Sequence, residues 1–149
     1  MGLTLIIVGA AALVLLIVFS IRRTRGRDGL EHHKITAEAL RALMSSNRDI
    51  LILDVRQPLD LLANSEIIPG AKRIPPREAL EKPWLIPKDE DAVVYCTCPS
   101  DKTSREVLRR VLSLHFSRVK FLSGGLAAWK AKGYPVETYA ESFHLDTAK

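Results

Sequence analysis

Hydrophobic positions from residue 35 onward alternate between strand-like runs and helical spacing. A near-continuous apolar run predicts a strand buried on both faces, as in a parallel sheet, at residues 49–56, and shorter runs predict a buried strand at residues 93–95 and a short strand at residues 119–122. Proline-flanked residues 72–76 predict a short edge strand. Apolar residues at helical spacing predict helices at residues 36–47, 105–114 and 126–132, with shorter helical stretches from Pro58 and at residues 77–86. This succession predicts an α/β domain with a mainly parallel sheet flanked by helices.

The N-terminal segment has a different pattern. Residues 2–21 carry no charged side chain and are almost wholly apolar, and about 20 such residues can cross a bilayer as a helix. A cleaved signal peptide is the alternative, but no basic residue precedes the apolar run. We therefore expect a single transmembrane anchor, a polar linker, one folded domain and a short tail, at residues 1–22, 23–34, 35–137 and 138–149.

Basic residues follow the apolar run directly, at Arg22, Arg23, Arg25 and Arg27. The positive-inside bias then predicts a single-pass membrane protein whose domain faces the cytoplasm. These arginines also account for most of the net charge of +5, because 22 basic residues minus four leave 18 against 17 acidic residues in 28–149. The basic charge thus belongs to the membrane flank, and we expect no nucleic-acid partner.

Cys96 is the strongest candidate for chemistry. It ends the strand at residues 93–95, and Thr103 with Glu106 fits a capping box that starts the next helix. The first turn of a helix has unpaired N–H groups, which can lower a cysteine pKa from about 8.5 to roughly 3.5–7.5. We expect a reactive thiolate, although a small buried side chain at a strand end is the plain alternative.

Two charged residues follow another predicted strand. Asp54 and Arg56 end the run at residues 49–56. In parallel sheets, the groups that face a ligand lie at the carboxyl ends of the strands. Asp54 and Arg56 would therefore lie at the same edge of the sheet as Cys96 if the two strands are neighbours. A salt bridge that orders the loop is an equally good reading.

Several further segments follow one another in a distinctive order. They are Leu53–Arg56, Ile68–Ala71 with Ile74-Pro75, Val93–Cys96, and Leu122–Gly125 followed by Trp129, Gly133, Tyr134 and Pro135. Together these segments resemble the rhodanese domains. The resemblance covers residues 35–137. Trp129 is also predicted from its residue type to be a core anchor.

This resemblance implies a sulfurtransferase. Its cysteine, here Cys96, takes a sulfane sulfur from thiosulfate or a polysulfide, becomes a persulfide and passes the sulfur to a thiol or cyanide. Asp54 and Arg56 would be supporting residues. No cofactor is implied. The donor would be held by the loop and the helix start, with the candidate binding residues Thr97, Cys98, Ser100, Lys102, Thr103 and Ser104.

The cysteine loop departs from the family pattern at two positions. A glycine and an arginine are usual where this chain has Pro99 and Asp101. Proline removes one backbone N–H, and Asp101 would repel an anionic donor if it faced the loop centre, or else turn outward and cap the helix. Lys102 is the candidate replacement cation.

These departures leave alternatives open. The domain could be an inactive rhodanese module that binds a partner at the membrane. Lys102 follows Cys96 after five intervening residues. The rhodanese-related phosphatases are similar in having a cation at this spacing, but theirs is an arginine, and Lys102 cannot make the bidentate contact that an arginine makes. Cys98 is either a resolving thiol or an inert loop residue. Zinc is disfavoured, because the chain has two cysteines and the paired His32 and His33 lie in the linker.

Overall fold

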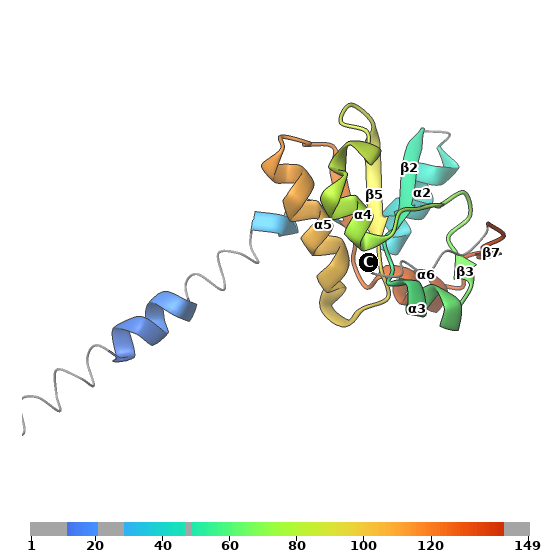
Figure 1. Cartoon of the computed structure of the whole chain (residues 1–149). Coiled ribbons are helices and arrows are strands. Elements are labelled where there is room, and N and C mark those ends of the chain that lie inside the picture. Colours follow the sequence, from blue (N-terminus) through green and yellow to red (C-terminus); the bar gives the residue numbers. More distant parts are fainter. Residues whose placement is uncertain (1–11, 21–28, 47–48, 142–149) are drawn as a thin grey trace, which may run out of the picture. The chain divides into compact units, whose positions relative to one another are not determined.

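Residues 12–20, 29–46 and 49–141 are described by the computed structural model (Figure 1). The chain divides into two units, residues 1–32 and residues 33–149. In the first unit, residues 12–20 are helical, and their large apolar side chains, from Leu13 to Phe19, are exposed. None of the helices in the described segments has the length and apolar character needed to cross a bilayer. The predicted anchor is therefore not supported there, and the rest of it, with the four arginines after it, lies outside the described residues.

A five-stranded parallel sheet forms the centre of the second unit. Its order is β1-β6-β5-β2-β4. The predicted buried strands are confirmed as β2 (Ile50–Asp54), β5 (Asp91–Tyr95) and β6 (Val119–Leu122), and the predicted edge strand as β4 (Lys72–Arg73). β1 (Lys34–Ile35) forms the other edge and was too short to leave a pattern.

Helices cover both faces of this sheet. Figure 1 shows α4 (Pro76–Glu81) and α5 (Lys102–Ser113) on the left of β5, and α2 (Ala37–Ser45) and α6 (Gly125–Ala131) on its right. Successive strand residues point to opposite faces, so Val93 and Tyr95 of β5 join the core beneath α2 and α6. Trp129 is fully buried in this core, as predicted, and donates from Nε1 to Pro135 O at 2.8 Å.

The remaining short elements agree with the proline signals. α3 (Pro58–Ala63) begins at Pro58, and α4 is followed at Pro83 by the 3-10 helix η1 (Pro83–Leu85). A second, two-stranded antiparallel sheet pairs β3 (Glu66–Ile67) with β7 (Glu137–Thr138). Neither strand was predicted, because two residues give no period.

One helix start differs from the prediction. Thr36 caps α2, accepting from Ala39 N–H at 3.2 Å. The expected capping box at Thr103 is wrong, since α5 already begins at Lys102 with Asp101 as its N-cap residue. The reason is a tight turn before the helix, the 3-10 segment η2 (Pro99–Asp101), which brings the chain into α5 earlier than the sequence indicates.

Candidate active site at the carboxyl end of β5

Cys96 follows the last residue of β5 and is 1% exposed. Its carbonyl accepts from Leu126 N–H in the first turn of α6 at 3.2 Å. Gly125 lies against the same carbonyl, and a Cβ at that position would lie 1.8 Å from Cys96 O. The close approach of α6 to the cysteine therefore requires a glycine, which is the physical reason for one glycine of the Gly124-Gly125 pair.

Cys98 lies beside Cys96 and is half-buried. The two sulfur atoms are 2.7 Å apart, and both cysteines are free thiols. Cys98 Sγ accepts from Thr103 N–H, in the first turn of α5, at 3.2 Å, and its thiol donates to Thr103 Oγ1 at 3.4 Å. A hydroxyl can reverse this bond and donate when the thiol ionises. The start of α5 thus binds the sulfur of Cys98 through Thr103 N–H, and its Ser104 N–H acts on Cys96, the cysteine that it was predicted to face.

Ser104 provides the other polar contact of Cys96. Its Oγ lies 3.5 Å from Cys96 Sγ and donates its proton to Asp101 O at 3.1 Å. A serine hydroxyl can donate to one partner at a time, so Ser104 can accept from the Cys96 thiol or turn to donate to the thiolate.

The pKa values of the two thiols are shifted in opposite directions. Burial, together with the hydrogen bond to Cys98, raises the pKa of Cys96 to about 11, against the opposing effect of Ser104 and of the backbone N–H groups of Cys98 and Ser104. Burial also acts to raise the pKa of Cys98, but hydrogen bonds from Cys96 and Thr103 outweigh it, so this pKa is lowered. The expected low pKa at Cys96 is thus wrong for the resting pair, in which the pKa of Cys98 is the lowered one.

The loop between Cys98 and α5 has a left-handed backbone at two successive residues. Ser100 has φ 58° and Asp101 has φ 56°, values that are uncommon outside glycine. The turn brings Asp101 N–H to Cys98 O at 3.2 Å. The Asp101 carboxylate is buried and accepts from Gly124 N–H at 3.0 Å. The alternative that Asp101 turns outward and caps α5 is therefore wrong, and the residue instead joins the cysteine loop to the turn before α6.

Asp54 and Arg56 lie at the end of β2, which pairs in parallel with β5 as the sequence argument required. Both are buried, and the guanidinium binds both carboxylate oxygens of Asp54, with Arg56 Nη2 at 2.5 Å from Oδ2. Its remaining donors reach Asn64 O and Glu66 O, each at 2.9 Å. Tyr95 OH donates to Asp54 Oδ2 at 3.1 Å. These contacts favour the salt-bridge reading, in which the pair orders the loop after β2.

The structure therefore brings together only some of the predicted binding residues. Cys98, Thr103 and Ser104 contact one another or Cys96, as described above. Thr97, Ser100 and Lys102 are exposed. Sequence reasoning missed the contact of Gly125 with Cys96 and the bond between Asp101 and Gly124, and the only signal for Gly125 was the paired glycine after β6.

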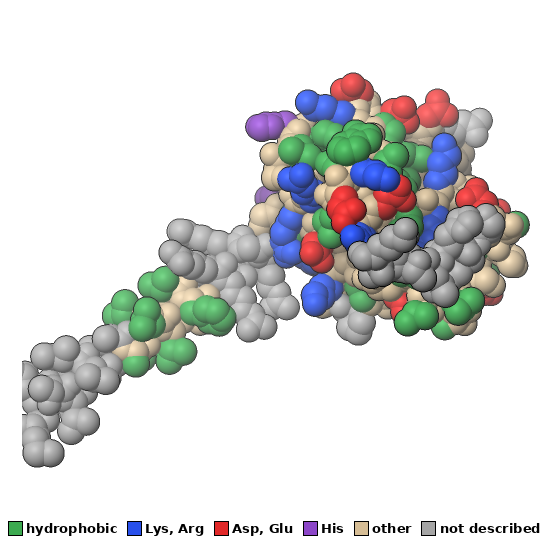
Figure 2. Space-filling view, in the orientation of Figure 1, with side chains coloured by type: hydrophobic (Ala, Val, Ile, Leu, Met, Phe, Trp, Pro, Cys, Tyr) green, Lys and Arg blue, Asp and Glu red, His purple; other side chains and the backbone are tan. Residues whose placement is uncertain are grey.

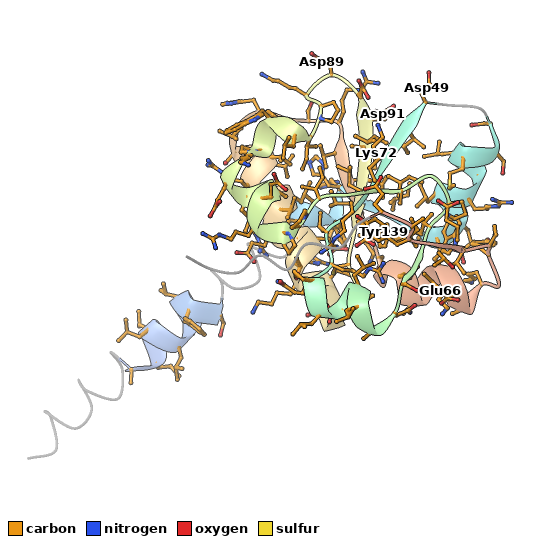
Figure 3. All side chains as sticks on the ribbon, turned by 45° about the vertical axis from the view of Figure 1, so that its right-hand side comes forward. Asp49, Glu66, Lys72, Asp89, Asp91 and Tyr139 are labelled. Carbon is orange, nitrogen blue, oxygen red and sulfur yellow. The ribbon has the colours of Figure 1, made fainter. Side chains whose placement is uncertain are left out.

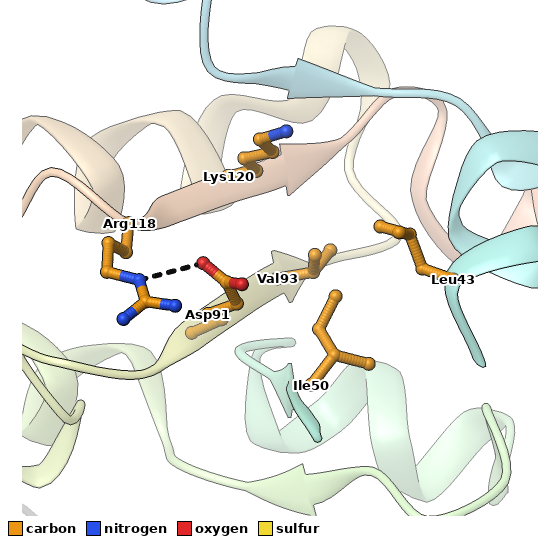
Figure 4. Close-up of a pocket in the computed structure, with 7 residues that line it drawn as sticks. Leu43, Ile50, Asp91, Val93, Arg118 and Lys120 are labelled. Carbon is orange, nitrogen blue, oxygen red and sulfur yellow. Dashed lines mark hydrogen bonds and ion pairs between the residues drawn. The ribbon is translucent and has the colours of Figure 1, made fainter. Parts of the chain in front are cut away.

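A pocket of about 100 Å³ lies at the opposite end of the sheet. It is lined by residues that include Asp91, the first residue of β5, and Arg118, whose Nε donates to Asp91 at 3.0 Å (Figure 4). Figure 3 shows Asp91 with Asp49 and Asp89 at this end, and Glu66 and Tyr139 lower in the view. The pocket is thus separated from Cys96 by the length of β5. Among the described residues, no cluster of histidine, cysteine or acidic side chains is arranged to hold a metal.

Comparisons with known proteins agree with this geometry. A protein from Allochromatium vinosum named "Sulfurtransferase" is 30% identical over 104 residues, 70% of this chain and 94% of that protein. The probable adenylyltransferase/sulfurtransferase MoeZ of Mycobacterium tuberculosis is 34% identical over 106 residues, 68% of this chain and 25% of that protein. The crystal structure of a rhodanese-related protein from Thermoplasma volcanium is also similar, with 27% identity and a TM-score of 0.58. The match covers 70% of this chain and 97% of that protein's chain.

The family model described as the rhodanese-like domain matches residues 36–132. The likeness to the solved structure extends over the α/β fold of the second unit. Since the match extends over more than half of the sequence, the chain belongs to the family of rhodanese-like domains.

Proposed function

We propose that this chain is a membrane-tethered sulfurtransferase, which carries sulfane sulfur as a persulfide on Cys96. The donor is thiosulfate or a polysulfide, and the acceptor is a thiol or cyanide. The observation that carries the proposal is the position of Cys96, which ends β5 and lies 2.7 Å from a second thiol of lowered pKa. The similarity to a protein named sulfurtransferase supports the same reaction class.

The resting pair supplies a route to the attacking thiolate. Cys96 has to lose its proton before it attacks, and the Cys98 thiolate at 2.7 Å is placed to accept it. The Cys96 thiolate then attacks the outer sulfur of thiosulfate, and sulfite leaves with the bonding electron pair. The backbone N–H groups of Cys98 and Ser104 favour the anionic form of Cys96 and would stabilise the persulfide anion.

Membrane tethering rests on the sequence alone. The support is the uncharged apolar run at residues 2–21 and the four arginines that follow it, which also favour a domain facing the cytoplasm. We expect the chain to stay in the membrane fraction after an alkaline carbonate wash, and the domain to be cut by protease only when the cytoplasmic side is accessible. Release by carbonate would contradict tethering without affecting the chemistry proposed for Cys96.

One set of observations favours a binding module instead. Pro99 has no backbone N–H that could bind the sulfur-donating substrate, and the N–H of Thr103 already donates to the sulfur of Cys98. Exposed apolar side chains at Leu59 and Leu62 on α3 and at Trp84 on η1 would provide contact surface for a partner. Figure 2 shows hydrophobic side chains on the surface of this domain among basic and acidic ones.

Sulfite release separates the two functions. The reduced full chain in mild detergent should release one sulfite per molecule from thiosulfate in a first turnover without an acceptor. Cys96→Ser should release none, and Ser113→Ala, an exposed change at the end of α5, should match the wild type. Sulfite release by Cys96→Ser would move the nucleophile elsewhere. No release from the wild type, with both thiols still alkylated by iodoacetamide, would support the binding module.

A further inference from the structure

The only two cysteines of the chain have their sulfur atoms in contact. The separation of 2.7 Å is close to the 2.05 Å of a disulfide bond, so a bond between them needs a small movement of two side chains. A residue that only accepts the proton of Cys96 would not need to be a second cysteine. The chemistry that distinguishes a thiolate from other bases is nucleophilic attack on sulfur.

We infer that Cys98 is a second catalytic residue, which resolves the persulfide on Cys96 and releases its sulfur as hydrosulfide. The Cys98 thiolate attacks Cys96 Sγ, the bond between that atom and the sulfane sulfur breaks, and a Cys96–Cys98 disulfide forms. This inference rests on the proposed function, because it begins from the persulfide on Cys96.

The reaction balances without an external oxidant. Neutral Cys96, the Cys98 thiolate and thiosulfate give the disulfide, one hydrosulfide and one sulfite, so the proton of Cys96 leaves on the hydrosulfide. The sulfane sulfur takes up the two electrons that the cysteines lose in forming the disulfide. A dithiol reductant then returns both cysteines to thiols. A disulfide between residues two apart is strained, which makes it easier to reduce.

The surroundings of the two sulfurs favour attack on Cys96 Sγ over attack on the outer sulfur. Attack on the outer sulfur would expel the Cys96 thiolate, and burial makes that thiolate a poor leaving group. Attack on Cys96 Sγ expels hydrosulfide, which is the anion of a stronger acid. Cys98 is also the less buried of the two thiols, and Thr103 N–H at 3.2 Å stabilises its charge before the attack.

The test is a single turnover of the reduced full chain with thiosulfate, without oxygen or added thiol. For the wild type we expect one sulfite and one hydrosulfide per molecule, and a product lighter than the reduced chain by two hydrogen atoms. For Cys98→Ser we expect slower release of sulfite, because the thiolate that accepts the proton of Cys96 is lost, with no hydrosulfide and a product heavier by one sulfur atom on Cys96. The rate for the wild type should not change on dilution, because both thiols belong to one molecule.

The outcomes separate this inference from the proposed function. Sulfur retained on the wild type, or a disulfide formed without hydrosulfide, would overturn the inference and leave the sulfurtransferase in place. Hydrosulfide released equally by Cys98→Ser would also overturn it. If the wild type releases neither sulfite nor hydrosulfide, the proposed function fails first. Cys98→Ala should behave as Cys98→Ser, which excludes an effect of the new hydroxyl.

Discussion

The neighbouring strands β2 and β5 are each followed or ended by side chains that could take part in chemistry, and these side chains have different surroundings. Asp54 pairs in register with Tyr95, the residue before Cys96, so the two ends are adjacent. At the end of β2, Asp54 and Arg56 form a salt bridge with each other. Their remaining hydrogen bonds are to neighbouring backbone carbonyls and to Tyr95. At the end of β5, two free thiols contact each other in a loop with a left-handed backbone.

The difference shows which polar strand end is suited to chemistry. A guanidinium with its donors already bound to Asp54, Asn64 and Glu66 has little to offer a substrate. The two thiols lie in contact and can form new covalent bonds. Position at the carboxyl end of a strand is therefore a weak guide by itself, and the state of the hydrogen bonds decides between the two readings.

The largest expected effect tests the end of β2. Arg56→Met should reduce the free energy of unfolding by about 3 kcal/mol, because it leaves the buried carboxylate of Asp54 with only Arg73, at 3.9 Å, as a cationic partner. Urea unfolding measures this loss. The control is Arg77→Met, which removes an exposed ion pair with Glu81 and should cost at most about 0.5 kcal/mol. Equal effects of the two changes would contradict a structural role for the buried pair.

Gly125→Ala should have an effect of similar size and act at the end of β5. The added methyl group would overlap Cys96 O, and we expect a loss of about 3 kcal/mol in the same unfolding experiment. Gly133→Ala is the matched control, since it also has a positive φ but meets no atom within 4 Å, and should cost about 1 kcal/mol. Similar losses would show that α6 does not press against the cysteine carbonyl.

A smaller and opposite effect is expected in the turn before α5. Ser100→Gly should stabilise the domain by about 1 kcal/mol, because glycine adopts the left-handed backbone without strain. Asp101→Gly relieves the same strain but removes the hydrogen bond to Gly124, so it should be the less stable variant of the two. A melting temperature that is higher for Asp101→Gly would contradict the role given to this carboxylate.

The thiol pair should respond reciprocally to removal of either partner. Cys98→Ser removes a contact that raises the pKa of Cys96, so this pKa should fall from about 11 while burial keeps it above the ordinary value. Cys96→Ser removes a contact that lowers the pKa of Cys98, so that pKa should rise. The pH dependence of iodoacetamide alkylation in each variant measures both shifts. Shifts in the opposite directions would mean that the two thiols do not share a proton.

Much of the fold was predictable because its signals are regular. Long apolar runs and helical spacing gave β2, β5, β6 and the main helices, and proline marked α3 and the break at Pro83. Strands of two residues gave no period. The site was predictable as far as Cys96 and its contacts Cys98, Thr103 and Ser104. Their arrangement was not, because nothing in the sequence reports that two left-handed residues place Thr103 N–H on Cys98.

Cys96 as the carrier of sulfane sulfur is the central claim, and peptide mapping of the Cys98→Ser full chain after thiosulfate tests it most directly. This variant keeps the nucleophile and lacks the thiol that would resolve the adduct. The account predicts one added sulfur on the peptide that contains Cys96. An unmodified Cys96 that still reacts with iodoacetamide, from a chain that unfolds as the wild type does, would contradict it.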